Sequence, residues 1–296
     1  MISVIIPVYK KVDEFINNLD NNLKFLKGCE IIVVNDDPTA SIKDRLEKYS
    51  VQLIENPKNL GFAVTIDKGI RKAKHNFVFL LNSDVKLLDD SYKTAVRKLE
   101  EFVPTQSRDP DAEAIGDKDK KIFGIAFAQK EGDGSIVGKN KIFWRNGLLT
   151  HSKADDLAEG ETGWVEGGSS IIRKDFYEEI GGFDMIFSPF YWEDIELAYR
   201  ARIHGYISWF DPNVMVEHRH ESTIGSFWSR RAISVIATRN QLLCTWKNIK
   251  DTNVLQHISY VTYQVLLSVF RGNLIFAEAF IKAFPSLFSP KFYKIR

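Results

Sequence analysis

Apolar runs and amphipathic stretches alternate along the first hundred residues, and this alternation constrains the fold more than any other feature. Residues 2–8 form an apolar run with a proline near its end, as expected of a strand buried in a parallel sheet. Further strands are predicted at 30–34, 51–55 and 77–81, and helices at 11–26, 41–48, 61–73 and 89–102. Strands that alternate with helices indicate βαβ units, so the predicted class is α/β with a mostly parallel central sheet flanked by helices.

The second half of the chain is less regular. Strands are predicted at 121–129, 167–173, 206–210 and 214–217, and helices at 174–180, 226–247, 254–270 and 273–284. The stretch 131–163 suits a hairpin and a flexible flap, and the charged stretch 104–120 suits a mobile surface loop. These patterns predict a domain at 1–225, with halves at 1–102 and 121–225, and a helical extension at 226–296.

Polar residues follow three of the first four predicted strands. Tyr9 follows the first, Asp36 the second, and Asn82-Ser83-Asp84 the fourth. Ligands of such sheets bind beyond the carboxyl ends of the strands. Asp84 could hold a divalent cation that bridges a diphosphate, or could cap the helix that follows. Asp36 could accept a hydrogen bond from a nucleotide base, or could shape its own loop.

Glu193 and Asp194 form an acidic pair at the start of a predicted helix that stops near Gly205. Carboxylates in a first turn are favoured by the helix dipole, so the pair could be no more than helix-start charges. The residues just before it are aromatic and rigid: Phe187, Pro189, Phe190, Tyr191 and Trp192. Such a wall beside a carboxylate is typical of an active-site base that faces a sugar.

His218 ends the last predicted strand of the first domain. Together with Asp84 it offers mixed imidazole and carboxylate ligation, which suits Mn²⁺ somewhat better than Mg²⁺. A histidine after a strand can also be structural, and for His220 the two interpretations stay equally open.

Composition excludes several classes of partner and compartment. Forty basic and 39 acidic side chains nearly cancel, so no nucleic-acid partner is expected. Cys29 and Cys244 are far apart in the sequence, which is typical of a reduced intracellular protein. No basic leader precedes the first strand, and the uncharged run at 258–270 is shorter than the roughly 20 residues that a membrane span needs. We therefore expect a cytoplasmic protein without a signal peptide or transmembrane helix.

The carboxyl-terminal helices carry many aromatic and basic residues. They could rest on an anionic membrane surface at the inner face of the cell membrane, or pack on the core or on a second subunit of a homodimer. These residues include Arg271, Lys282, Phe284, Phe288, Lys291, Phe292, Tyr293, Lys294 and Arg296.

Signatures of other enzyme classes are missing from the sequence. It contains no GxxxxGK[ST], no GxGxxG after the first strand, no GxSxG and no HExxH.

Taken together, the motifs resemble glycosyltransferase family 2, which has the GT-A fold, and especially its rhamnosyltransferase-like branch that acts on bacterial surface polysaccharides. The resemblance covers most of the chain up to about Lys247. The segments that carry it are Val4–Tyr9, Asn35-Asp36, Asn59-Leu-Gly61-Phe-Ala63, Asn82-Ser83-Asp84, Gly181-Gly-Phe-Asp184, Trp192-Glu193-Asp194, Val216-x-His218 and Arg239-Asn240.

The resemblance implies inverting, metal-dependent transfer of a sugar from a UDP- or dTDP-sugar to a hydroxyl of a glycan or lipid-linked glycan. Asp194 would be the catalytic base, Glu193 would orient it, and Asp84 and His218 would hold Mn²⁺ or Mg²⁺. The donor would be bound by Pro7, Tyr9, Asp36, Asn59, Gly61, Asn82 and Ser83. The acceptor would be bound by Trp192, Gly167 and Gly168.

Three departures from the family pattern keep other functions open. Asn35 and Asn82 replace acids that are common at those positions, and Asp67 stands where an asparagine is frequent. A non-catalytic carbohydrate-binding protein on a degenerate transferase fold is one alternative. A sugar-nucleotide pyrophosphorylase is another, but the segment after the first strand lacks the Gly-rich basic loop of those enzymes.

Overall fold

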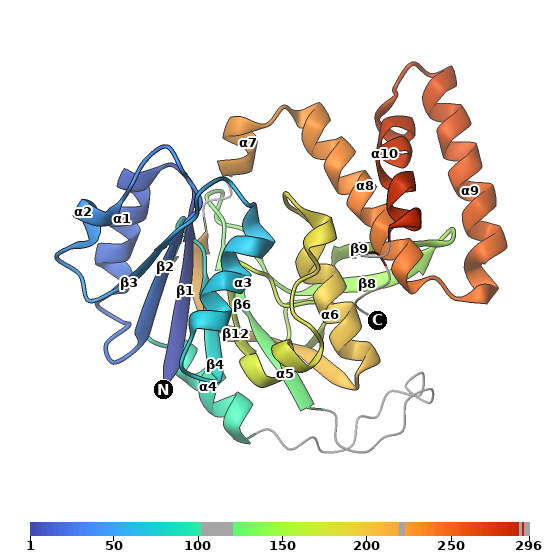
Figure 1. Ribbon diagram of the computed structural model, residues 1–296. Helices are drawn as coiled ribbons and strands as arrows, with labels where there is room; N and C mark the ends of the chain where they lie inside the picture. Colours follow the sequence, from blue (N-terminus) through green and yellow to red (C-terminus); the bar gives the residue numbers. More distant parts are fainter. Residues whose placement is uncertain (102–120, 219–222, 290–291, 293–296) are drawn as a thin grey trace.

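The computed structural model describes residues 1–101, 121–218, 223–289 and 292, and Figure 1 shows their arrangement. The predicted loop at 104–120 and His220 lie outside the described residues.

The first half of the chain forms the parallel part of a ten-stranded sheet. Eight strands follow the order β10-β12-β6-β11-β4-β1-β2-β3, and the other two lie off this path: β5 (Val85–Leu87) pairs with β12 and β7 with β6. The strands of the parallel part are β1 (Ile2–Val8), β2 (Glu30–Asn35), β3 (Gln52–Glu55) and β4 (Phe77–Leu81). The four strands pair in parallel, as the alternation of apolar runs and helices predicts.

The second half adds strands in mixed directions. They are β6 (Lys121–Lys130), β11 (Ser169–Arg173), β12 (Tyr206–His218), β10 (Gly160–Thr162) and β7 (Ile136–Val137). β11 runs antiparallel to both β4 and β6, while β12 runs parallel to β6. The two late strands predicted at 206–210 and 214–217 are one strand, which a register shift between Asp211 and Met215 interrupts.

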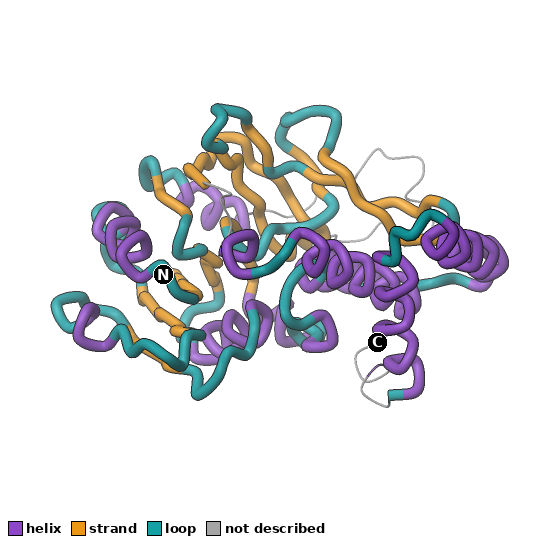
Figure 2. Tube along the Cα trace, turned by 90° about the horizontal axis from the view of Figure 1, so that it is seen from above, coloured by secondary structure: helices purple, strands orange, loops and turns teal. Residues whose placement is uncertain are grey.

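Helices cover both faces of the sheet, with a buried apolar cluster under each set (Figure 2). On one face lie α1 (Val12–Asn22) and α4 (Tyr92–Glu101); on the other lie α3 (Phe62–Lys72), α5 (Lys174–Glu179) and α6 (Glu193–Ile203). The short α2 (Lys43–Leu46) precedes β3. A Cβ at Gly69 would lie 2.3 Å from Cγ2 of Ile5, so α3 packs closely on β1 because that position has no side chain.

A third apolar cluster joins the carboxyl-terminal helices to the second half of the chain. These helices are α7 (Thr223–Phe227), α8 (Arg230–Asn248), α9 (Asp251–Phe270) and α10 (Ile275–Ala283), followed by a 3-10 turn at Phe284–Phe288. The cluster also contains residues of α6 and of the hairpin β8 (Asn140–Arg145) and β9 (Leu148–Lys153), which confirms the predicted hairpin. None of the helices within the described ranges is both long and apolar enough to cross a membrane.

Candidate active site

A cavity of about 570 Å³ opens at the carboxyl ends of β1 and β4 and reaches the first turn of α6. The structure brings together in its lining every residue that the sequence analysis placed in the site, although their roles remain predictions. These residues are Pro7, Tyr9, Asp36, Asn59, Gly61, Asn82, Ser83, Asp84, Gly167, Gly168, Trp192, Glu193, Asp194 and His218. Two walls can be distinguished: the strand-end wall, made by segments 7–9, 59–61 and 82–84, and the loop wall, made by segment 187–194.

Asp36 shapes the strand-end wall by holding the turn that precedes α3. Its Oδ1 accepts hydrogen bonds from the backbone N–H of Leu60 (2.8 Å) and from Asn56 (2.9 Å), and its Oδ2 accepts one from Gly61 (2.9 Å). The carboxylate therefore shapes its loop, as one of the two sequence interpretations predicted, and it also lines the cavity.

Gly61 brings this turn against the loop wall. It adopts φ 82°, and a Cβ there would lie 2.9 Å from the carbonyl oxygen of Pro189. The N–H of Phe62 donates to the same oxygen at 3.3 Å. Only a glycine combines the left-handed backbone with so close an approach.

Asp84 is placed by asparagines of α1 and by the short strand β5 that follows it. Asn18 donates to the carbonyl of Ser83, and Asn22 bonds both β5 residues Val85 and Leu87, at 2.8–2.9 Å. These contacts hold the segment on either side of Asp84, so the carboxylate faces the cavity and His218.

Asp84 and His218 meet at the floor of the cavity. Oδ1 of Asp84 lies 3.4 Å from Nε2 of His218, and it is a buried oxygen without a hydrogen-bond partner among the described residues. Burial disfavours the charged imidazole, but the Asp84 carboxylate outweighs it, so the pKa of His218 is raised. An orphaned carboxylate oxygen beside an imidazole nitrogen fits a divalent cation. No cluster of three such ligating side chains occurs in the described part of the chain.

Glu193 and Asp194 begin α6 and face the cavity from the loop wall. Burial, followed by the charge of Glu166, raises the pKa of Asp194 well above the usual carboxyl range. The pKa of Glu193 is raised by burial and by the charge of Asp194, and its Oε2 has no hydrogen-bond partner among the described residues. The N–H groups of Ile195 and Gly167 oppose the shift of Asp194 but do not cancel it. The arrangement can accept a proton near neutral pH, as a general base must.

The backbone of the loop wall is held in an unusual conformation by α8. Tyr191 and Trp192 adopt φ 70° and 75°, a region that costs non-glycine residues about 1–3 kcal/mol each. Asn240 donates to the carbonyls of Phe187, Phe190 and Tyr191 at 2.7–2.9 Å. Arg239 donates to the carbonyls of Ile186 and Ser188. The Arg239-Asn240 pair of the sequence motif therefore fixes the direction in which α6 begins.

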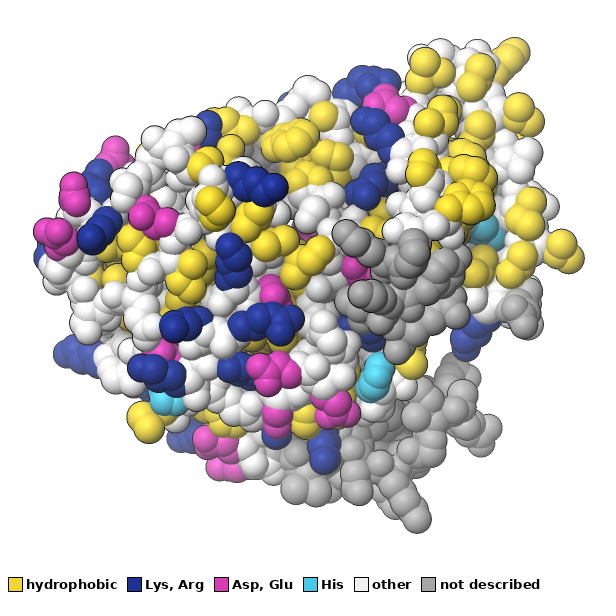
Figure 3. Space-filling model, viewed as in Figure 1, with side chains coloured by type: hydrophobic (Ala, Val, Ile, Leu, Met, Phe, Trp, Pro, Cys, Tyr) yellow, Lys and Arg dark blue, Asp and Glu magenta, His cyan; other side chains and the backbone are white. Residues whose placement is uncertain are grey.

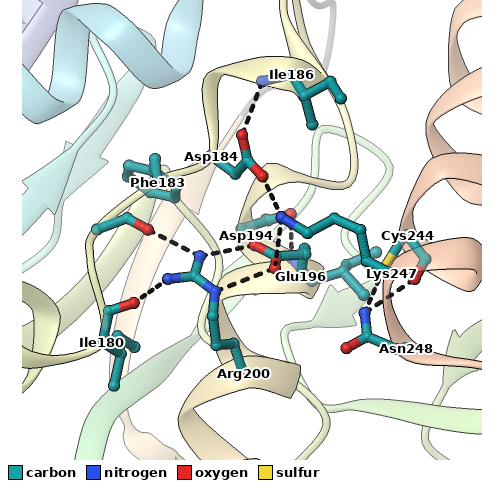
Figure 4. Close-up of polar contacts among 12 residues, drawn as sticks. Ile180, Phe183, Asp184, Ile186, Asp194, Glu196, Arg200, Cys244, Lys247 and Asn248 are labelled. Atoms are coloured by element: carbon teal, nitrogen blue, oxygen red, sulfur yellow. Dashed lines mark hydrogen bonds and ion pairs between the residues drawn. The ribbon is translucent and has the colours of Figure 1, made fainter. Parts of the chain in front are cut away.

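Two acids and two bases form a buried cluster behind the loop wall (Figure 4). Arg200 binds Glu196 through two nitrogens, at 2.7 and 3.0 Å, and also donates to the carbonyls of Ile180 and Gly182. Lys247 of α8 binds Asp184 and lies 3.7 Å from Glu196. The cluster ties α6 to α8 and to the Gly-Gly-Phe-Asp turn.

Glycines 167 and 168 are required by close packing at the back of the cavity. A Cβ on Gly167 would lie 2.7 Å from the Phe62 ring, and one on Gly168 would lie 2.5 Å from Nδ2 of Asn82. Their predicted contact with an acceptor stays a prediction. Trp192 is 5% exposed and its ring packs edge-on against His151, whereas Tyr191 is 38% exposed and offers more ring surface to a ligand.

Sequence reasoning missed several residues of the lining. Glu166, which influences the pKa of Asp194, carried one signal, its position directly before Gly-Gly. The others are single aromatic or polar residues without a pattern: Thr65, His151, Trp164, Phe227 and Trp228.

The mixed sheet, its helices and the cavity at the strand ends define a protein with the GT-A fold. The sequence model of "Glycosyl transferase family 2" matches residues 3–181. The chain therefore belongs to glycosyl transferase family 2.

Curated relatives and solved structures are similar to this chain. The poly-beta-1,6-N-acetyl-D-glucosamine synthase of Staphylococcus aureus (strain MSSA476) is 23% identical over 236 residues, which cover 78% of this chain and 52% of the relative. The chain thus spans about half the length of that curated relative. The structure of GalNAc-T7 with UDP, GalNAc and Mn²⁺ has a TM-score of 0.59 and 15% identity, covering 83% of this chain and 47% of that one. That of S. aureus TarS 1-349 with UDP-GlcNAc has a TM-score of 0.56 and 14% identity, covering 97% and 82%. At these identities the structures establish the fold alone.

Proposed function

We propose that the protein is an inverting, metal-dependent glycosyltransferase that moves a sugar from a UDP- or dTDP-sugar to a hydroxyl of a glycan or lipid-linked glycan in surface polysaccharide synthesis. The observation that carries the proposal is the pair of buried Glu193 and partly exposed Asp194. The raised pKa values of the two carboxyls suit a base, and both line the same cavity as Asp84. The nucleotide sugars and cations named for the structural neighbours, and the polymer made by the curated relative, support it.

The proposed reaction is a single displacement. Asp194 accepts the proton of the acceptor hydroxyl while that oxygen bonds to the anomeric carbon, and the bond from this carbon to the donor diphosphate breaks. The attack comes from the face opposite the diphosphate, so the anomeric configuration inverts. Glu193 orients Asp194 or the acceptor, and the strand-end wall holds the nucleotide with Tyr9 beside it.

Asp84 and His218 would hold Mn²⁺ or Mg²⁺, since the orphaned Oδ1 of Asp84 faces Nε2 of His218. When bound, such a cation stabilises the negative charge that develops on the departing diphosphate. The residues themselves bring one carboxylate and one imidazole to the end of the strand-end wall that faces Asp194.

The first test is a thermal-shift panel of UDP, dTDP, GDP and CDP, each with and without Mn²⁺. A specific ligand raises the melting temperature by mass action, because at a hundredfold excess over Kd it adds about 2.7 kcal/mol to the free energy of unfolding. We expect a Mn²⁺-dependent shift with UDP or dTDP and its loss in Asp84→Asn. An Asp37→Asn control keeps the shift, because Asp37 bonds within its own turn to Thr39. No shift with any nucleotide would favour the non-catalytic carbohydrate-binding alternative.

The finer assignment to the rhamnosyltransferase-like branch is part of the proposal and concerns the donor. The curated relative is named as a synthase of an N-acetylglucosamine polymer, so UDP-GlcNAc and dTDP-rhamnose are the two donors to compare. Slow, Mn²⁺-dependent release of nucleotide from dTDP-rhamnose alone would favour that branch. Release from UDP-GlcNAc alone would contradict it.

We also propose that the carboxyl-terminal helices rest on an anionic lipid surface at the cytoplasmic face of the membrane. Apolar side chains gather over these helices in Figure 3. They include Leu255, Ile258, Tyr263, Leu266, Val269, Phe270, Leu274, Ile281, Phe284 and Phe288, which are 45–90% exposed. The exposed bases Arg271 and Lys282 lie among them in the sequence, and such a mixture suits an interfacial helix.

Vesicle flotation tests this surface. The protein is expected to float with phosphatidylglycerol vesicles more than with phosphatidylcholine vesicles, and Leu266→Glu with Phe270→Glu to abolish flotation. Leu88→Glu, at an exposed position of the first half, is the matched control. A dimer in solution that the same two changes dissociate, without flotation of the parent, would instead identify a second subunit as the occupant.

A further inference from the structure

A chain of buried amides runs from Asn140 on β8 to His218 beneath the cavity. Nδ2 of Asn140 donates to Oε1 of Glu166 at 3.1 Å, and Nε2 of Gln129 donates to the other oxygen of Glu166. Oε1 of Gln129 lies 2.6 Å from Nδ1 of His218. Gln129 is fully buried, and Asn140 and His218 are 8% and 7% exposed, so these contacts are shielded from competing water.

The direction of each hydrogen bond follows from Glu166. An ionised carboxylate only accepts hydrogen bonds, so the nitrogen of the Gln129 amide must face Glu166. The oxygen of the same amide then faces His218, and an amide oxygen also only accepts. The hydrogen in the 2.6 Å contact must therefore sit on Nδ1 of His218.

This direction determines what the other imidazole nitrogen presents. A neutral imidazole with its hydrogen on Nδ1 carries a lone pair on Nε2. That lone pair points toward Oδ1 of Asp84 at 3.4 Å. This oxygen is also an acceptor, and it has no hydrogen-bond partner among the described residues. Two facing lone pairs repel each other, and these two groups would instead hold a divalent cation.

The strands make the contact possible. Gln129 is the second-to-last residue of β6 and pairs with Val216 of β12, after the register shift between Asp211 and Met215. This shift lies between the first part of β12 and the histidine that Gln129 contacts, and it sets the pairing by which Gln129 reaches the imidazole.

We propose that Gln129 is a positioning residue that holds His218 with its hydrogen on Nδ1 and its Nε2 lone pair toward Asp84, and that Glu166 sets the direction of the Gln129 amide. The proposal rests on the cation role given above to Asp84 and His218. Residues that hydrogen-bond the other ring nitrogen of a metal-ligating histidine typically contribute 10- to 100-fold to metal affinity or activity.

The first experiment reads the imidazole itself, without metal or substrate. Long-range ¹H–¹⁵N NMR of the metal-free protein, at a pH where His218 is neutral, distinguishes hydrogen on Nδ1 from hydrogen on Nε2. The His218→Asn spectrum assigns the signal among the six histidines. We expect the Nδ1–H form in the parent protein. Hydrogen on Nε2 would overturn the proposal, whether or not the protein is a transferase.

The second experiment removes the amide. Gln129→Met keeps a long side chain but neither accepts from His218 nor donates to Glu166, so we expect a mixture of the two imidazole forms. Mn²⁺ affinity, measured from the EPR signal of free Mn²⁺ with saturating UDP, is expected to fall about 10- to 100-fold. Gln241→Met is the control, because Gln241 bonds the carbonyl of Leu149 on the hairpin.

A third variant keeps the proposal testable if Gln129→Met does not fold. Glu166→Gln can donate as well as accept, so the direction of the Gln129 amide is no longer imposed. The Nδ1–H form is expected to become mixed in this variant too. An unchanged imidazole form in whichever of the two variants folds would refute the role of Gln129. If the parent shows the Nδ1–H form but does not bind Mn²⁺ with UDP, the metal dependence of the proposed function fails and the positioning role stands.

Discussion

The two walls of the cavity are built in different ways. The strand-end wall follows the ends of parallel strands: Asp36, directly after β2, holds residues 60 and 61 through their backbone N–H groups, and Asn18 on α1 holds the carbonyl of residue 83. The loop wall depends on distant partners, since Asn240 and Lys247 on α8 reach back more than fifty residues to it and to the turn behind it. A wall made of strand ends inherits its geometry from the sheet, whereas a wall made of loop must be held by side chains from elsewhere.

The largest effect on activity is expected from the loop wall. Asp194→Asn removes the proposed base and should lower kcat by about 10²–10⁴-fold, as general bases contribute. Steady-state turnover with an excess of acceptor measures it, with Asp37→Asn as the control. Turnover within about tenfold of the parent would contradict the assignment of Asp194 as the base.

The same variant should be more stable than the parent at neutral pH. Burial raises the folded-state pKa of Asp194, so the folded protein binds that proton more tightly than the unfolded chain does. Its contribution to stability is complete at pH values below the pKa of the unfolded chain and is lost as pH rises through the raised pKa. Asparagine never ionises, so the melting-temperature gap should grow from acid to neutral pH. A constant gap would argue against a raised pKa.

The next largest effect, a loss of stability, is expected when the buried cluster behind the loop wall is disrupted. Lys247→Met leaves Asp184 without its buried partner, and breaking a buried pair in this way costs about 3–5 kcal/mol. Urea denaturation measures the loss. Lys93→Met is the control: Lys93 makes a 2.6 Å ion pair with Asp90, both side chains are more than half exposed, and such surface pairs contribute about 0–1 kcal/mol. Equal losses in the two variants would mean that the cluster is not what holds the loop wall.

A smaller effect on stability is expected on the strand-end wall. Asp36→Asn places an N–H group opposite one of the three donors that the carboxylate accepts, at a cost of about 1–3 kcal/mol. The turn is local, so the protein should stay folded while nucleotide affinity falls. Isothermal titration with the nucleotide of the thermal-shift panel tests this. A large loss of stability with unchanged nucleotide affinity would contradict this, because it would mean that Asp36 supports the whole fold and not only the strand-end wall.

The smallest effect concerns pH. The base must be deprotonated to act, so kcat should rise with pH through the pKa of Asp194. Glu166 raises that pKa, and Glu166→Gln should move the rising limb toward lower pH at saturating Mn²⁺. Glu14→Gln, on the opposite face of the sheet, removes the same charge and should leave the profile unchanged. If the rising part of the pH profile moved to higher pH in Glu166→Gln, Glu166 would be excluded as the neighbour that raises the pKa of Asp194.

The contrast between the walls also explains what the sequence could predict. Strands 1 to 4, the hairpin and the start of α6 follow from apolar periodicity and helix signals, which are local. Tyr9, Asp36, Asp84, Glu193, Asp194 and His218 could be named because they lie near the end of a strand or begin a helix, whereas the other candidates came from the resemblance to family motifs. Periodicity does not report pairing direction, so the predicted strand at 167–173 carried no sign that it is antiparallel, and β12 was predicted as two strands. The amide chain through Gln129 and Glu166 escaped because its members come from segments far apart in the sequence and only the folded chain makes them neighbours.

The amide of Asn240 has a consequence for how this protein tolerates change. Its Nδ2 serves three carbonyl oxygens of the loop wall, and its Oδ1 accepts from Arg239. Aspartate would place carboxylate oxygens, which only accept hydrogen bonds, against the three carbonyl oxygens. Glutamine would be one methylene too long, and an apolar residue would leave all three carbonyls without this donor. In a saturation library of α8, position 240 is therefore expected to be the least permissive, and evolution has little room to retune the loop wall except by changing residues that line the cavity itself.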